Sequence, residues 1–238
     1  MKIDFHVHSK YSFDSIMEID NVIEVARKRG LGGIAITDHN NVKGGLEGVK
    51  LKKYQDFIVI PGIEIATNKG EILGMFLNKS LNSRTPSEVI DEIRDQGGIS
   101  IIAHPYKRTK RIDEELLNRI DGTEGFNSRC TRFENEMAQQ IAAEYNLPMV
   151  SGSDAHFYFE IGRGTCIIEN VSELEDIRGA VIRGEARISG TESSPYVEPL
   201  SQMIRAFKTN NPKLLFTNVL LRSMSISYQT LAEKLKIF

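Results

Sequence analysis

Two histidines lie two residues apart near the start of the chain, within the sequence IDFHVH at residues 3–8. Apolar and polar residues alternate there, which is typical of a β-strand. Because side chains two apart on a strand point to the same face, we expect His6 and His8 to point at one spot, with Asp4 beneath them. Two imidazoles at one strand end provide half of a metal site, although two surface histidines would explain this pair alone equally well.

Similar residues recur after each later apolar run. All five histidines of the chain stand at the carboxyl end of a predicted strand, with carboxylates nearby. In closed β/α barrels that end carries the active site, so we expect these side chains to meet in one pocket. The polar residues that follow the later runs are Asp38, His39, Glu64, His104, Glu124, Asn127, Asp154 and His156.

The chemistry of this set points to metal ions. Imidazole and carboxylate ligands without cysteine pairs suit Zn²⁺, Mn²⁺ or Fe rather than a closed structural zinc site. The candidates are too many for one ion and predict two or three divalent ions that share carboxylates. Glu64 and Asp154 are the expected bridges, because a carboxylate has two oxygens and imidazole only one free lone pair. The eight candidate ligands are His6, His8, Asp14, His39, Glu64, His104, Asp154 and His156.

Such a centre predicts hydrolysis. Two ions ~3.5–4 Å apart hold a hydroxide, polarise a phosphoryl oxygen and lower the pKa of bound water toward ~7. The metal-bound hydroxide attacks phosphorus in line, so no side-chain nucleophile is needed. Asp154 or His156 is the expected catalytic group that passes a proton to the leaving group. We therefore expect a phosphoesterase.

Repeated β-α units must position these residues. Short apolar runs alternate with amphipathic stretches, which indicates an α/β protein with a parallel sheet. The 238 residues suit one barrel-sized domain, and the net charge of −2 argues against a polycation built for DNA. The predicted strands are 3–8, 33–37, 57–60, 99–103, 123–126, 148–151 and 165–168, with a hairpin within 63–75 and a short strand at 186–188. The predicted helices are 20–30, 42–53, 86–96, 113–120, 134–145 and 173–183.

The alternation ends after Pro195. Residues 197–238 predict two or three helices, with a break near Asn211 and Pro212. Apolar residues at 214–216 and 219–221 demand burial on the barrel or at a dimer contact, so a homo-oligomer stays open. The tail from Ser201 onward carries about five net positive charges, which fit either the wet side of packing helices or a nucleotide or short nucleic acid at the mouth. The charged residues are Arg205, Lys208, Lys213, Arg222, Lys234 and Lys236 against Glu233.

Five motifs together resemble those of the PHP (polymerase and histidinol phosphatase) superfamily, in order and in spacing. They are HVH at 6–8, TDH at 37–39, PGIE at 61–64, AHP at 103–105 and GSDAH at 152–156. The resemblance covers roughly residues 1–190 and is closer to the stand-alone phosphoesterases than to the polymerase-attached domains. It implies a distorted seven-stranded (β/α) barrel at 1–194, with 195–238 as a helical C-terminal extension.

The resemblance also implies which ligands share an ion. His6 and His8 would hold one ion together with Glu64 and Asp154. Asp14, His39 and His156 would hold a second ion, and Glu64 and His104 a third. Many family members have a further His or Cys after the fifth strand. This chain has Asn127 and Cys130 there, so Cys130 is a candidate ligand and Asn127 a candidate pocket residue.

Fixed cations near the metals would bind the phosphate of the substrate. Arg129 and Arg163 rank first, because their loops are tied to strand ends. Lys107 and Arg108 follow His104 on the same loop. For each of these side chains, a solvated surface position is an equally good explanation.

Several substrates and functions fit these residues. The first is a nucleotide or the end of a short oligonucleotide, and the alternative is a histidinol-phosphate-type small molecule. A non-catalytic binding module stabilised by metal is a different class of function, and hydrolysis of a carbon–nitrogen bond is a third. Because no segment resembles a signal peptide or a membrane helix and there are two cysteines, we expect a cytoplasmic protein without a membrane partner.

Overall fold

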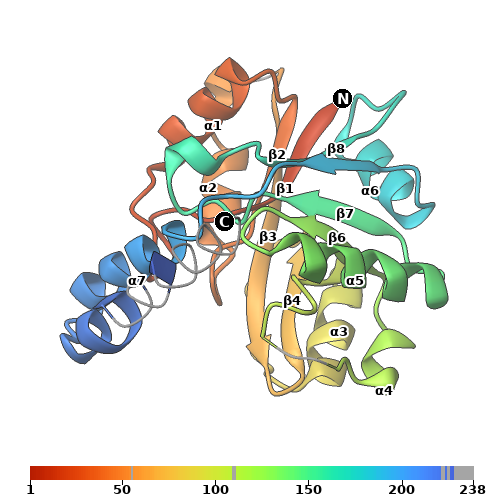
Figure 1. The fold of residues 1–238 in the computed structure, drawn as a ribbon. Coiled ribbons are helices and arrows are strands. Elements are labelled where there is room, and N and C mark those ends of the chain that lie inside the picture. The colour runs from red at the N-terminus through yellow and green to blue at the C-terminus, as the bar shows by residue number, and fades with distance from the viewer. Residues whose placement is uncertain (55, 109–110, 221–222, 224–225, 228–238) are drawn as a thin grey trace, which may run out of the picture.

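The computed structural model describes residues 1–54, 56–108, 111–220, 223 and 226–227. Nine strands form one sheet in the order β7-β6-β5-β4-β3-β2-β1-β8-β9. Its last members return to its first, because β7 lies against β1, β8 and β9, so the sheet is a nearly closed barrel (Figure 1). The strands are β1 (Lys2–Val7), β2 (Gly33–Ile36), β3 (Ile58–Thr67), β4 (Gly70–Met75), β5 (Ile99–Ile102), β6 (Gly122–Asn127), β7 (Met149–Gly152), β8 (Gly164–Ile167) and β9 (Arg187–Gly190).

The expected α/β barrel is confirmed, but its strand count of seven was wrong. The two additional members of the sheet are β4 and β9, which the sequence had suggested only as a hairpin arm and a short terminal strand. Strand β3 runs on to Thr67, and β4 returns antiparallel between β3 and β5. Strands β1, β2 and β3 pair in parallel, as do β5, β6 and β7, so their carboxyl ends meet at one rim.

Helices cover the outside of this sheet. Strands buried on both faces are nearly continuous apolar runs, as in β5 with its sequence ISII. Helix α1 begins at Ile19, so Asp20 lies in its first turn and is not the N-cap that the sequence suggests. Helix α3 begins at Pro86, as expected from the proline after Thr85. The helices are α1 (Ile19–Lys28), α2 (Lys43–Val49), α3 (Pro86–Arg94), α4 (Glu114–Leu117), α5 (Arg132–Glu144), α6 (Leu174–Ile182) and α7 (Val197–Lys208).

Strand β1 does not alternate strictly. Its register against β2 shifts between Asp4 and Val7, which is an irregularity of the kind that re-aims side chains. The Asp4 carboxylate accepts hydrogen bonds from the backbone N–H of Ser153 (2.9 Å) and of Gly162 (2.7 Å). Asp4 therefore joins β1 to the segments that follow β7, and it holds the barrel closed just below the two histidines.

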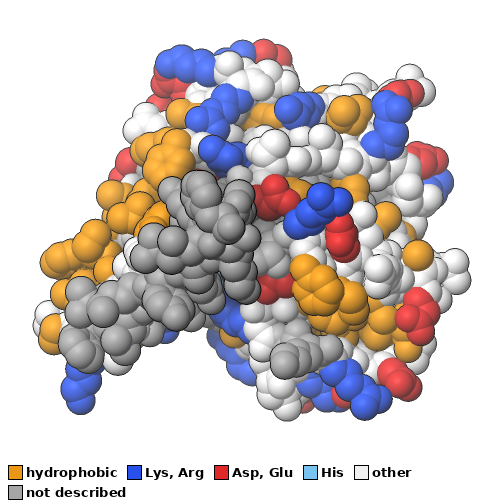
Figure 2. Space-filling view, viewed as in Figure 1, with side chains coloured by type: hydrophobic (Ala, Val, Ile, Leu, Met, Phe, Trp, Pro, Cys, Tyr) orange, Lys and Arg blue, Asp and Glu red, His pale blue; other side chains and the backbone are white. Residues whose placement is uncertain are grey.

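The C-terminal segment contains α7 and a π-helical turn at Leu215–Leu220. Leu214, Leu215 and Val219 are half-buried, whereas Phe216, Leu220, Leu221, Arg222, Lys234 and Lys236 have side chains outside the described part. Hydrophobic side chains gather on the outer side of α7 (Figure 2), where Leu200 is 40% and Phe207 71% exposed. A dimer contact there remains a prediction. Within the described residues, no helix has the length and apolarity to cross a membrane.

Closure of the barrel requires a glycine at 152. A Cβ there would overlap the Cβ of His6 and would meet Glu124 Oε1 at 2.6 Å. Replacing Gly152 with Ala should therefore lower the free energy of unfolding by about 1–3 kcal/mol, as overpacking of a core does. The measurement is urea unfolding of the chelated protein.

Gly179→Ala is the matched control, because the nearest atom to its added Cβ, at 2.9 Å, is the Arg183 Nη1 at the tip of a flexible side chain. We expect this helix variant to be as stable as the wild type or slightly more stable. Equal stability of Gly152→Ala and the wild type would contradict the close approach of β7 to β1.

Candidate metal centre

The end of β1 brings two imidazoles into direct opposition. The Nε2 atoms of His6 and His8 lie 3.0 Å apart, and both residues are fully buried. Two neutral imidazoles that face each other with lone pairs repel, so a proton or a cation must lie between them. These histidines thus face one spot, as the alternating sequence predicts.

The carboxylate of Glu64 lies beside this pair. Glu64 on β3 places its Oε2 3.4 Å from His8 Nε2, 3.6 Å from His6 Nε2 and 2.8 Å from His39 Nδ1. Its other oxygen, Oε1, lies 3.0 Å from His104 Nε2. Glu64 therefore reaches all the imidazoles except that of His156, and it stands where a bridging carboxylate would have to stand.

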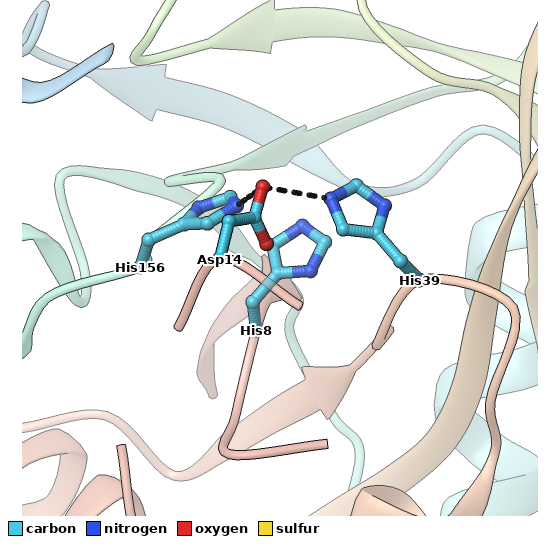
Figure 3. Close-up of side chains that lie close together, drawn as sticks. All are labelled: His8, Asp14, His39 and His156. Atoms are coloured by element: carbon cyan, nitrogen blue, oxygen red, sulfur yellow. Dashed lines mark hydrogen bonds and ion pairs between the residues drawn. The ribbon is translucent and has the colours of Figure 1, made fainter. Parts of the chain in front are cut away.

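Asp14 joins the imidazoles of His39 and His156 (Figure 3). Its Oδ2 lies 3.3 Å from His39 Nε2 and 3.2 Å from His156 Nε2. His8 belongs to the same group, since the ligand atoms of these four residues lie within 4.8 Å of one another. Asp14, His39 and His156 come from three loops that are far apart in sequence, and the barrel rim brings them together.

Asp154 is the second carboxylate beside the histidine pair. Its Oδ1 is 3.3 Å from His8 Nε2 and 3.7 Å from His6 Nε2. Asp154 has a φ of 52° and His104 a φ of 27°, both in the left-handed region that residues other than glycine rarely adopt. Such strain is typical of functional sites, and here it occurs at two candidate ligands that follow strand ends.

Two acids near the centre were missed or left without a role in the sequence interpretation. Glu71 on β4 forms a cluster with Glu64 and His104. Glu124 on β6 lies 3.0 Å from His6 Nδ1 and accepts the backbone N–H of His104 at 2.8 Å. Glu124 thus orients His6 from behind, and its place after an apolar run was the signal that could have assigned it.

Hydrogen bonds outside the centre fix the imidazole orientations. His8 Nδ1 lies 2.9 Å from Ser12 Oγ, and Ser12 in turn donates to Asp38 Oδ1 at 2.7 Å. Asp38 also accepts the backbone N–H and the hydroxyl of Ser9, each at 2.6 Å. Such partners leave the Nε2 of His8 directed at the centre, as is typical of metal-binding histidines.

The donor set fits divalent ions. Asp14 Oδ1 is buried without a hydrogen-bond partner in the described structure. Glu64 Oε2 accepts no well-directed hydrogen bond although three imidazole nitrogens surround it. Buried polar atoms of this kind are rare and costly, and a cation would satisfy both. The described residues offer four clusters able to hold an ion, and all four contain histidine and carboxylate.

Burial and neighbouring charges set the protonation states of these groups. Burial and the nearby His156 and His39 hold the pKa of His8 well below its usual value, so its imidazole is neutral. Burial opposes charge on His39, but the carboxylates of Glu64 and Asp14 outweigh it and raise the pKa to about 10. Burial alone would raise the pKa of Asp14, yet the charges of His156 and His39 hold it well below the ordinary range.

The predicted phosphate-binding cations lie in different environments. Lys107 donates to Asp154 Oδ2 at 2.9 Å, at the edge of the centre. Arg108 donates to both oxygens of Glu71. The side chain of Arg129 is buried and donates to Glu160 at 2.9 and 2.6 Å. It also lines the small cavity that most of the candidate ligands line, here called the central cavity. Arg163 lies outside that lining and donates to the carbonyl of Glu192.

Two further candidates from the sequence are Asn127, the last residue of β6, and Cys130. Asn127 donates to Glu124 Oε2 at 3.0 Å, so it supports the acid that orients His6. Cys130 is buried, and burial raises the pKa of its thiol far above the ordinary value. Cys130 belongs to none of the clusters found among the described residues.

Helix α7 roofs the centre. Glu198, Ser201 and Gln202 line the same cavity as the candidate ligands. Ser201 accepts a hydrogen bond from Arg129 at 3.1 Å. At the end of the helix, Lys208 Nζ donates to the carbonyls of residues 10, 12 and 15 at 2.8, 2.6 and 2.9 Å. The roof is therefore anchored to the loop that carries Asp14.

Two family models match the chain. One, described as PHP domain, matches residues 4–123, and one described as PHP-associated matches residues 132–186. The chain belongs to the PHP domain family. The resemblance inferred from the five motifs is thereby confirmed.

Curated relatives extend this result. An uncharacterized protein of Methanocaldococcus jannaschii, MJ1587, is 40% identical over 141 residues, which are 54% of this chain and 82% of the relative. A second one, MJ0417, is 35% identical over 68% of both chains. The DNA polymerase III PolC-type of Streptococcus pneumoniae is 36% identical over 64 residues, which are 26% of this chain and 4% of that protein.

Solved structures share the fold of this PHP protein. A two-domain protein from Bacteroides vulgatus, described as containing a predicted PHP-like metal-dependent phosphoesterase, has a TM-score of 0.70 at 20% identity, covering 80% of this chain and 65% of that one. An amidohydrolase from Chromobacterium violaceum with bound sulfate has a TM-score of 0.60 at 16% identity, covering 75% and 96%. At this identity the likeness shows the fold.

Asp14 should be required for one of the ions. We expect the purified protein to contain two or three divalent ions per chain, and Asp14→Asn to contain about one fewer, because the variant loses the only carboxylate near both His39 and His156 in that group. Elemental analysis after gel filtration measures this. Asp56→Asn, with a side chain that is 70% exposed, is the control. An unchanged ion content in Asp14→Asn would contradict the assignment.

Ion uptake should release protons. Because the pKa of His39 is raised to about 10 in the metal-free protein, His39 carries a proton at pH 8 that a metal ligand must lose. Adding Zn²⁺ to chelated protein in weakly buffered solution at pH 8 should acidify it by about one proton per chain or more. The release should shrink as the starting pH is raised toward 10, and uptake without acidification at pH 8 would disprove this protonation state.

Proposed function

We propose that this PHP protein is a metal-dependent hydrolase of phosphate esters. The observation that carries the proposal is a set of eight imidazoles and carboxylates, seven of them buried and His39 half-buried, which converge at one rim and include two carboxylate oxygens without a hydrogen-bond partner. When bound, the ions would supply a hydroxide nucleophile near neutral pH and would polarise the phosphoryl oxygen. The ligands would be His6, His8, Asp14, His39, Glu64, His104, Asp154 and His156, with Glu71 as an addition.

Lys107 is the cation best placed to bind the phosphate. Its Nζ lies 2.9 Å from Asp154 Oδ2 and 4.0 Å from Glu198 Oε2, on the wall of the central cavity. Burial opposes its charge, but Asp154 and Glu198 outweigh burial and raise the pKa of Lys107 further, so it stays protonated. A permanently charged ammonium here would attract and orient a phosphate group but would be a poor proton donor.

Arg129 takes a positioning role in this proposal. Its Nε and Nη2 donate to the two oxygens of Glu160, and Glu160 also accepts the backbone N–H of His156 at 3.0 Å. The pair therefore fixes the loop that carries Asp154 and His156. These two remain the proposed groups for proton transfer to the leaving group, since they are the acid and imidazole on the wall beside Lys107.

The shape of the centre favours the end of a substrate. The cavity between the ligands and α7 has a volume of about 20 Å³, room for about one water. A substrate phosphate is larger than this space and would have to meet the ions at the edge of the cavity, which the end of a molecule can do and the interior of a long strand cannot do without an open channel. We therefore propose a small ester or nucleotide, or the end of a short oligonucleotide.

The activity test uses an aryl phosphate with added Mn²⁺, before and after exhaustive chelation. We expect hydrolysis that chelation abolishes and Mn²⁺ restores. Lys107→Met should lower kcat/KM by about 10²-fold, as loss of one fixed electrostatic donor does. Lys79→Met, at an exposed position, should behave as the wild type.

Two outcomes would reverse the proposal. Activity that survives complete removal of metal would exclude the mechanism. A folded, metal-loaded protein inert toward aryl phosphates, nucleotides and histidinol phosphate would favour the alternative, a non-catalytic binding module. The match to part of a PolC-type polymerase is the observation that keeps this alternative in view.

A further inference from the structure

Helix α7 covers the metal centre with polar side chains. Glu198, Ser201 and Gln202 line the central cavity, and the last two are buried, whereas Leu200 and Phe207 on the same helix are exposed. A surface helix normally buries apolar side chains and exposes polar ones. Over the cavity, α7 is therefore held by polar contacts, and lifting it there would uncover little apolar surface.

This helix lies outside both family matches. They cover residues 4–123 and 132–186, and α7 begins at Val197. The candidate ligands, in contrast, all lie between residues 6 and 156, within the matched parts of the chain. The centre thus belongs to the part that the family models describe, and its cover does not.

Glu198 directs a carboxylate at two cations of the cavity wall. Its Oε2 lies 4.0 Å from Lys107 Nζ and 3.8 Å from Arg129 Nη1. Burial opposes charge on Glu198, but these cations outweigh burial and hold its pKa below the ordinary value, so the carboxylate is ionised. Glu198 belongs to none of the four clusters of possible metal ligands among the described residues. Its charge therefore lies beside Lys107, the cation proposed to bind the phosphate.

A phosphate inside the cavity would need the place that Glu198 takes. Carboxylate and phosphate oxygens accept the same hydrogen bonds from ammonium and guanidinium groups, so the two anions suit the same partners. The central cavity of about 20 Å³ has room for about one water, and two anions placed side by side there would repel each other. A phosphate can therefore move from the edge of the cavity to its inner wall only when the carboxylate leaves.

The two ends of α7 are held differently. At its carboxyl end, Lys208 donates to three carbonyls, and the guanidinium of Arg205 lies 4.5 Å from the centre of the Phe13 ring. At its amino end, the distances of 3.8 and 4.0 Å from Glu198 to the two cations are longer than those of direct hydrogen bonds. An anion that binds the cations would thus weaken the amino end, while the carboxyl end keeps the helix attached.

We propose that α7 is an inhibitory lid, in which the Glu198 carboxylate occupies the phosphate position beside Lys107 and Arg129 and must leave before a phosphate binds there. The proposal rests on the proposed phosphoesterase function, since it takes the phosphate of that substrate as the competing anion. The lid opens at its amino end and stays attached at Lys208, and the position of α7 described above is the closed one.

The first test removes the charge of the lid and keeps its shape. Protein loaded with Mn²⁺ and freed of excess metal is titrated with inorganic phosphate by calorimetry. Glu198→Gln should bind phosphate about tenfold more tightly than the wild type, because a site that is open in about a tenth of the molecules shows about a tenth of its intrinsic affinity. Glu192→Gln, the same change at an exposed position, is the matched control and should bind as the wild type does. Equal or weaker binding by Glu198→Gln, or binding by neither protein, would overturn the lid.

The second test needs no variant. A helix of 12 residues that has lost its contacts is marginally stable, so trypsin can cut a lifted α7 after Arg205 or Lys208. Saturating phosphate should raise the rate of these cuts in the wild type about tenfold, as measured by mass spectrometry of the peptides. In Glu198→Gln the cuts should be fast without phosphate. A wild-type rate that phosphate leaves unchanged or lowers would contradict the lid.

Activity separates this proposal from the proposed function. If both hold, Glu198→Gln should lower KM for an aryl phosphate about tenfold and leave kcat within about twofold, because the substrate no longer competes with the carboxylate. Tighter phosphate binding by a variant that, like the wild type, hydrolyses no ester would leave the lid standing and overturn the hydrolase. Hydrolysis with the same KM and the same phosphate affinity in both proteins would do the reverse.

Discussion

Compensation of buried charge at one rim of the barrel is the constraint on which the rest of this structure depends. A carboxylate removed from water costs several kcal/mol unless opposite charge or hydrogen bonds replace the lost solvation. Glu64 is 1% exposed, and it is tolerated because imidazoles from β1, from the loop after β2 and from the loop after β5 surround it. The strands must therefore end at the same level, and the left-handed backbone at His104 and Asp154 is the local cost of that convergence.

Much of the site could be predicted, because its residues follow strands that pair in parallel. The sequence marks the end of each apolar run, and parallel pairing of β1 with β2 and β3, and of β5 with β6 and β7, brings those ends together. Glu71 was not among the predicted ligands, for the opposite reason. Strand β4 runs antiparallel, so its beginning, not its end, reaches the rim, and local periodicity gives no sign of that reversal.

Other features depend on contacts between distant residues and had no local signal. The ion pair of Arg129 is an example, because its partner Glu160 lies 31 residues further on. The roof formed by α7 was expected only as a helix packed somewhere on the barrel, because an amphipathic pattern shows that a face is buried but not against what. The irregularity in β1 likewise depends on the register with β2, which the sequence of β1 alone does not specify.

The ammonium of Lys208 connects the position of α7 to the loop that carries Asp14. It donates hydrogen bonds to three carbonyls of this loop, so α7 and the loop with the candidate ligand Asp14 are held together. Any tilt of α7 must therefore either break the hydrogen bonds of Lys208 or move Asp14 together with the helix. If ion binding shifts Asp14, it therefore also favours one position of α7, and by linkage that position favours ion binding by the same free energy.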